Sequence, residues 1–501
     1  MMAFDKVFRL AAPWIAIALL FAGQIAIRLA SDLNHDAAWY LYVAQGLLDG
    51  GELYRDFVEV NPPLGIWLTV PAVMLSRATG LAPVETLYGA FFTTTLLATL
   101  LVQRYLALIQ GVPDLMKGLI LSLLVAAFLF TPGPSFGQRE HLLVLLFMPW
   151  FMLRAARSRG AHVTAAESAF VGLLGAAAIC LKPHTILAPI ALEVLLFLRG
   201  RSFRAVFAPE NLSAIVSAAF YGLAIVIWSP PFLTEMLHLG VAAYVPYYGF
   251  EAALILEHSL RPALILILAF VLQRMSEGPM RELSGLALTV AAGFLAAYFL
   301  QAKGFHYQAM PAEIFALAAG IFAFAGVLDD KAVSGVKKPL VVPAIVATAI
   351  AALSFTSQAY LGSPFNSGID IARFRPGAKS FFIASTNVYN GFPLAVRENL
   401  IWASRFPTLW LVPYVADRWH EGPLPDDPII AYALEAIVTD LQKFRPEVVF
   451  INQSTSQSYI RGGTFDYLKF LRLDSRFATI WSNYELRGQV GTFAVYVVKS
   501  P

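Results

Sequence analysis

Apolar segments about as long as a bilayer is thick recur along the first 356 residues of the chain. A spanning helix needs about 20 mostly apolar residues, and eleven segments approach that length: 11–29, 84–103, 118–133, 141–153, 165–181, 184–198, 211–229, 262–273, 283–300, 308–327 and 339–356. The composition agrees, because 58% of the residues are hydrophobic and 14% are charged, against about 25% charged in soluble domains. We expect a polytopic α-helical membrane protein with about 11 transmembrane helices, and the composition excludes an ordinary soluble enzyme and a partner of nucleic acid.

The basic residues orient these helices. Cytoplasmic connections carry an excess of Lys and Arg. If residues 64–78, which include Pro71, lie at the membrane surface, the two sides hold 15 and 7 basic residues, with the N-terminus on the richer side. If that segment crosses the membrane, the N-terminus lies on the side with 7 basic residues and the other side holds 15. The chain is therefore expected to have a cytoplasmic N-terminus and a first outer loop over residues 30–83.

The last part of the chain is more polar. Residues 357–501 hold 26 of the 69 charged residues, so we expect a transmembrane domain over 1–356 and an extracytoplasmic α/β domain over 357–501. Strands are expected at 380–384, 408–412, 447–451, 477–481 and 492–498, and helices at 429–443 and 464–472. The tail from Leu486 to Ser500 is expected to be a closing hairpin.

Ionisable residues gather in the outer loops of this topology. Such groups at a membrane boundary usually mark a functional cavity. In the first loop, Asp36 falls in the first turn of a helix expected over residues 36–48, where a carboxylate is favoured. The others follow later spans: Arg139, Glu140 and His141; Lys182 and His184; Lys303, His306 and Tyr307.

The order of these residues carries a resemblance. The first loop has Asp36-x3-Tyr40-x3-Ala44, Gly51-x2-Tyr54-Arg55-Asp56 and Pro62-Pro63-Leu64; the later loops have Arg139-Glu140-His141, Lys182-Pro183 and Lys303-x3-Tyr307-x3-Pro311. Over roughly residues 1–330 this resembles the GT-C glycosyltransferases, in the branch that holds protein O-mannosyltransferases and lipid A aminoarabinose transferases. The chain departs from that pattern at Ala37 and Asn61, where the family often has an acidic residue and a Lys.

The resemblance implies an inverting transfer of a sugar from a polyprenyl-phosphate donor. The acceptor would be lipopolysaccharide, another glycan, a lipid or a protein at the outer, periplasmic face of a bacterial inner membrane. Such a transfer needs a base for the attacking hydroxyl and cations beside the leaving phosphate. Asp36 is the candidate base; Lys303, Arg139, Lys182 and Arg55 are the candidate phosphate ligands; and Tyr40, Asp56, Glu59, His306 and Tyr307 are candidates for substrate binding.

Other interpretations stay open at this stage. Asp36 could cap its own helix, Arg139 could pair with Glu140, and Lys182 could extend to the interface. No cofactor is expected, with a divalent metal as the alternative. The chain could also be a transporter or flippase of lipid-linked sugars, or a non-catalytic scaffold for glycan assembly. A transporter, however, typically has its polar sites near the membrane midplane and in repeated halves.

Overall fold

The computed structural model describes residues 2–249, 251–329 and 368–499. The span expected at 339–356 and the domain boundary expected after residue 356 lie outside these residues. The described chain forms two compact units. The first comprises residues 2–31, 88–223 and 251–329, and the second comprises residues 32–87, 224–249 and 368–499.

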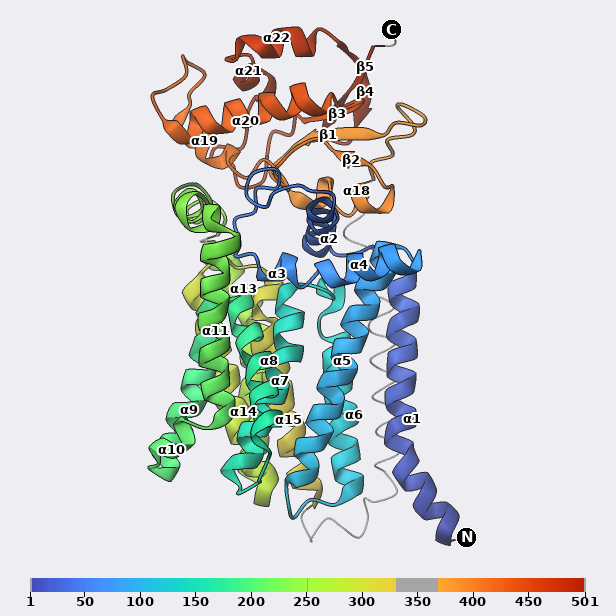
Figure 1. Cartoon of the computed structure of the whole chain (residues 1–501), viewed down its shortest axis with the longest axis vertical. Coiled ribbons are helices and arrows are strands. Elements are labelled where there is room, and N and C mark those ends of the chain that lie inside the picture. The colour runs from blue at the N-terminus through green and yellow to red at the C-terminus, as the bar shows by residue number, and fades with distance from the viewer. Residues whose placement is uncertain (1, 250, 330–367, 500–501) are drawn as a thin grey trace. The chain divides into compact units, whose positions relative to one another are not determined.

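Long helices that run side by side build the first unit (Figure 1). They are α1 (Met2–Leu29), α5 (Pro83–Leu108), α6 (Asp114–Phe130), α7 (Arg139–Ser158), α8 (Ala165–Leu181), α9 (Leu187–Gly200), α11 (Pro209–Trp228), α13 (Ala252–Met275), α14 (Gly278–Gln301) and α15 (Met310–Asp329). Each matches an expected span. Seven helical segments in the described residues are long and apolar enough to cross a membrane. The chain is thus a polytopic membrane protein, although the expected count of 11 is not confirmed.

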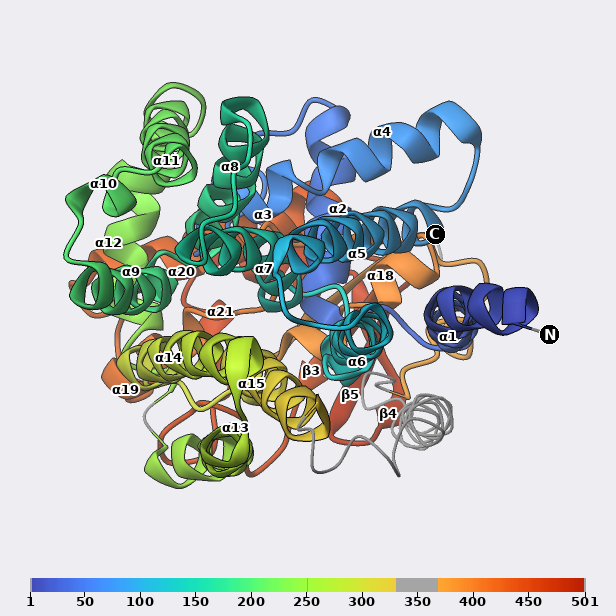
Figure 2. The ribbon, with the colours of Figure 1, turned by 90° about the horizontal axis from the view of Figure 1, so that it is seen from below.

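Helix α7 lies inside this bundle, as the end-on view shows (Figure 2). Its side chains from Glu140 to Ala156 are buried, apart from the half-buried Leu142. An interior helix can hold a charge only if that charge is paired. Arg154 is paired: its Nε lies 2.6 Å from a Glu193 oxygen, and its Nη1 lies 2.8 Å from a Glu210 oxygen. These ion pairs connect α7 to α9 and α11.

The second unit joins the first outer loop to the C-terminal domain. Helix α2 (His35–Leu48) is followed by α3 (Leu64–Trp67) and α4 (Val70–Thr79), which cover the segment expected at the membrane surface. The C-terminal helices are α18 (Leu394–Arg397), α19 (Val412–Arg418), α20 (Pro428–Phe444), α21 (Tyr467–Leu471) and α22 (Ser475–Trp481).

The C-terminal domain is built on one five-stranded sheet with the order β2-β1-β3-β5-β4. The strands are β1 (Ser380–Ala384), β2 (Ile401–Trp402), β3 (Val448–Asn452), β4 (Tyr484–Val490) and β5 (Phe493–Val498). β1 is parallel to both β2 and β3, whereas β5 is antiparallel to β3 and β4. All residues of β1 are buried, which is typical of a parallel strand in the middle of a sheet.

Most of the expected elements of this domain are confirmed, and two are wrong. β1, β3 and β5 match expected strands, α20 and α21 match the expected helices, and β4 with β5 forms the expected hairpin. The strand expected at 408–412 is instead a turn that leads into α19, because Pro413 occupies the start of that helix. The strand expected at 477–481 is helix α22, whose first turn is capped by Asp474.

Candidate functional site

Asp36 lies in the first turn of α2, in the second unit, where the sequence places it. It does not cap the helix. Asn34 does so, because its side-chain oxygen accepts from the Asp36 backbone N–H at 2.9 Å. The Asp36 carboxylate is 27% exposed, lies 3.5 Å from His35 Nε2, and benefits from the positive end of the helix dipole. Tyr40, one turn further on, is buried.

Aromatic side chains hold α2 against the C-terminal domain. Trp39 packs edge-on against Phe392 at 5.3 Å between ring centroids, and Tyr42 lies 5.6 Å from the same ring. The Tyr42 hydroxyl accepts from the backbone N–H of Trp402 at 3.1 Å. These contacts fix the orientation of the helix that carries Asp36.

Glu59 is buried and links two parts of the first loop. One of its oxygens accepts from Trp39 Nε1 at 2.7 Å, and the other accepts from the Asn61 backbone N–H at 2.9 Å. The Asn61 side chain also donates to Glu59. Asn61 thus orders the turn before Pro62-Pro63.

Residues 54–56 form a tight turn between α2 and α3. Tyr54 is buried, has a left-handed φ of 73° and donates to the Asn61 carbonyl at 2.8 Å. Arg55 is exposed and lies 2.8 Å from Glu52. Asp56 lies 3.2 Å from Lys443 Nζ of α20. The backbone N–H of Glu52 and the Lys443 cation lower the pKa of Asp56.

The first unit holds the predicted cations of the later loops. Lys182, just after α8, forms an ion pair with Glu140 in the first turn of α7, and both side chains are buried. The Lys182 ammonium also lies over the ring of Tyr307, 5.7 Å from its centroid. The sequence suggested Arg139 as the partner of Glu140, but the structure pairs Glu140 with Lys182.

His184 lies near three of the predicted cations. Lys182, Arg139 and Lys303 all lie close enough to this side chain to act on it electrostatically. These residues come from three separate loops. The first unit therefore holds three of the four predicted phosphate ligands within electrostatic range of one side chain.

His306 and Tyr307 form a short turn (His306–Ala309) before α15. His306 Nε2 lies 3.2 Å from the Ser135 hydroxyl, and the His306 ring lies 5.9 Å from that of His258. Sequence reasoning did not single out Ser135, His258 or Gln301. The only sequence feature that could have indicated these three residues is that each lies next to an outer loop. In the part of the chain that the structure describes, no group of three or more His, Cys, Asp or Glu side chains is arranged to hold a metal ion.

Apolar spanning helices and a mixed-sheet domain make up this membrane protein, for which the sequence predicts the GT-C fold. Two solved structures of ArnT from Cupriavidus metallidurans confirm this fold. The one bound to undecaprenyl phosphate is 13% identical, with a TM-score of 0.58 over 96% of this chain and 97% of that chain. The apo structure is 14% identical, with a TM-score of 0.55 over 99% and 98%. No family model matches the sequence, and neither does any curated protein.

Proposed function

We propose that the protein is an inverting membrane glycosyltransferase that uses a polyprenyl-phosphate sugar. The observation that carries the proposal is the match of nearly the whole chain to ArnT, one of whose structures contains undecaprenyl phosphate. The acceptor would be lipopolysaccharide, another glycan, a lipid or a protein. The reaction would occur at the periplasmic face of the inner membrane, consistent with the distribution of basic residues in the sequence.

Asp36 is the proposed base. The acceptor hydroxyl oxygen attacks the anomeric carbon of the sugar, and the bond from that carbon to the phosphate oxygen breaks. The hydroxyl proton passes to the Asp36 carboxylate, and polyprenyl phosphate leaves with the bonding electrons. The partial exposure of Asp36 supports the role, because an acceptor hydroxyl can reach the carboxylate from outside the helix.

The leaving phosphate gains negative charge in this step, so nearby cations lower the barrier. We propose Lys303 and Arg139 as the main phosphate ligands, with Arg55 as a further one. Lys182 is already paired with Glu140, so its role is to hold that carboxylate and Tyr307 in place as much as to bind phosphate. His306, Tyr307, Tyr40, Asp56 and Glu59 remain proposed substrate contacts. For Asp56 and Glu59 the bonds described above support an ordering role in the first loop.

The first test measures transfer from a radiolabelled polyprenyl-phosphate sugar to membrane acceptors. Asp36→Asn keeps the shape of the side chain and removes the base. We expect the rate to fall 10²- to 10⁴-fold, the range of general-base catalysis, with the protein still folded. Asp114→Asn is the matched control, because Asp114 also lies exposed in the first turn of a helix. Full transfer by Asp36→Asn would reject Asp36 as the base, and uptake without transfer in liposomes would favour a transporter.

A further inference from the structure

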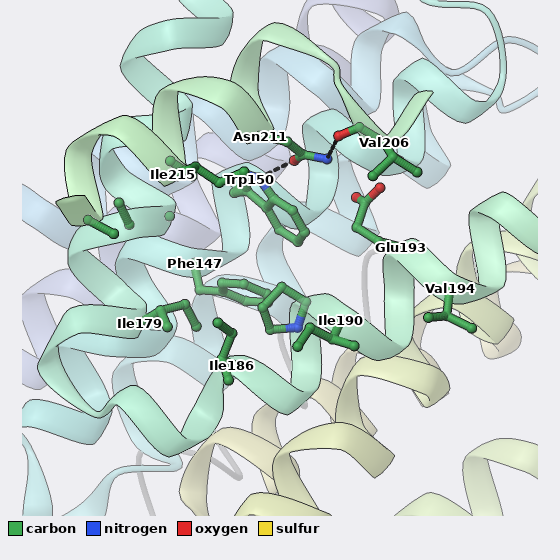
Figure 3. Close-up of a pocket in the computed structure, with 15 residues that line it drawn as sticks. Phe147, Trp150, Ile179, Ile186, Ile190, Glu193, Val194, Val206, Asn211 and Ile215 are labelled. Atoms are coloured by element: carbon green, nitrogen blue, oxygen red, sulfur yellow. Dashed lines mark hydrogen bonds between the residues drawn. The ribbon is translucent and has the colours of Figure 1, made fainter. Parts of the chain in front are cut away.

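An apolar pocket of about 380 Å³ opens in the first unit between α7, α8, α9 and α11 (Figure 3). Phe147 and Trp150 of α7 form one wall, and Ile190 and Ile215 contribute from α9 and α11. Gly175 of α8 makes room for Trp150, because a Cβ there would lie 3.0 Å from the indole ring. None of the proposed catalytic or phosphate-binding residues lines this pocket.

The few polar groups of the pocket are already bonded. The Glu193 carboxylate receives two hydrogen bonds from Arg154. The Asn211 side chain accepts from Trp150 Nε1 at 3.2 Å and donates to the Val206 carbonyl at 3.0 Å, as the dashed lines in Figure 3 show. A ligand would therefore meet a neutral, apolar lining, which suits a hydrocarbon chain.

The pocket is continuous with the lipid-facing surface of the unit. Ile186, Ile190, Val194 and Ile215 line it and are 47%, 50%, 51% and 63% exposed. They belong to two segments long and apolar enough to cross a membrane, Pro183–Gly200 and Pro209–Trp228. A chain from the surrounding bilayer can enter sideways without passing through water.

One lining residue of the pocket belongs to a connection that carries several basic residues. Val206 lines the pocket and ends α10 (Phe203–Val206), the short helix between α9 and α11. Arg199 in the last turn of α9 is exposed, and so are Arg201 and Arg204 on the connection itself. Phe203 and Phe207 beside them are also exposed, at 68% and 60%, as in segments that lie at a membrane interface.

We propose that this pocket and the connection bind one anionic phospholipid. An acyl chain fills the pocket, and the phosphate lies at Arg201 and Arg204. Basic pockets between transmembrane helices bind acidic head groups in this way. A volume of about 380 Å³ holds about a dozen water-sized groups at roughly 30 Å³ each, which suits an acyl chain better than a long polyprenyl chain.

The test compares phosphatidylglycerol and phosphatidylcholine with identical acyl chains, bound to the whole protein and counted by native mass spectrometry. We expect one tightly retained phosphatidylglycerol on the wild type. Arg201→Gln/Arg204→Gln should weaken its binding roughly 30-fold, or about 2 kcal/mol, and leave phosphatidylcholine unchanged. Arg274→Gln/Arg281→Gln, at two exposed arginines in the last turn of α13 and the first turn of α14, is the matched control and should have no effect.

A second pair of variants tests the pocket itself. Ala214→Phe places a ring in it and should weaken the binding of both lipids, whereas Ala219→Phe, on the exposed face of α11, should not. If Ala214→Phe does not fold, Ala218→Leu fills the same lining more gently. Unchanged phosphatidylglycerol binding in the arginine or the pocket variants would overturn the proposal. Displacement of phosphatidylglycerol by an equal amount of polyprenyl phosphate would also overturn it, because the pocket would then be a binding site for polyprenyl phosphate.

Discussion

At the scale of single residues, the sequence did not predict the buried ion pair between Lys182 and Glu140. Arg139 is the sequence neighbour of Glu140, but adjacent residues on a helix point in different directions. The true partner comes from the end of another helix, and nothing in the sequence gives that distance. The sequence could nominate the charged residues because they are rare in apolar surroundings, whereas their pairing depends on how the helices pack.

Removing one charge of this pair should destabilise the protein more than removing both charges. Glu140→Leu leaves the Lys182 ammonium buried without its counter-charge, and we expect a loss of about 3–5 kcal/mol of stability. Lys182→Met/Glu140→Leu removes both charges and should recover most of that loss. Thermal unfolding of the purified protein in one detergent measures the difference. Equal melting temperatures for the single and double variants would contradict the pairing.

At the scale of elements, apolar runs predicted some strands well and others badly. β1, β3 and β5 are mostly apolar strands in the interior of the sheet. β1 is buried along its whole length and β3 along all but its last residue, whereas β5 is partly exposed. β4 carries Glu485 and Arg487 at the sheet edge, so its composition resembles a loop. Residues 477–481 are as apolar as a strand, but the Asp474 cap starts a helix there.

The turn after α2 offers a pH test of a contact between elements. Asp56 connects this turn to α20 through Lys443, and its pKa lies below its ordinary value of 3.8. A carboxyl with a lowered pKa stabilises the fold fully above its ordinary pKa, and this contribution is lost as the pH falls through the lowered one.

We therefore expect Asp56→Asn to lower the melting temperature at pH 7 and to differ less and less from the wild type as the pH falls below about 4. Melting curves from pH 7 to pH 3 measure this effect. Asp426→Asn, at an exposed position of the same unit, serves as the control and should follow the wild type throughout. A difference between Asp56→Asn and the wild type that stays constant with pH would contradict the assignment.

At the scale of the whole molecule, contacts distant in sequence build the second unit. Asp32 pairs with Arg397 at 2.9 Å, and the Val58 backbone N–H donates to the Arg405 carbonyl at 2.7 Å. The hydroxyl of Tyr247 donates to Asp417 at 2.8 Å. Composition separated an apolar part from a polar tail, but it could not reveal that residues 32–87 and 224–249 pack with that tail, because such contacts depend on tertiary structure.

It follows that the C-terminal domain should not behave as an independent module. Residues 368–499 alone would expose Phe392 and Trp402, which α2 covers through Trp39 and Tyr42, and large exposed apolar surfaces promote association. We expect this fragment to aggregate and the same fragment joined to residues 32–87 by a flexible linker to be more soluble and more monomeric. Size-exclusion chromatography of the two fragments at equal concentration measures how far each one associates. A monomeric, cooperatively unfolding fragment without residues 32–87 would show that α2 is only an appendage of the domain, and α2 would then need another support to hold Asp36 in place.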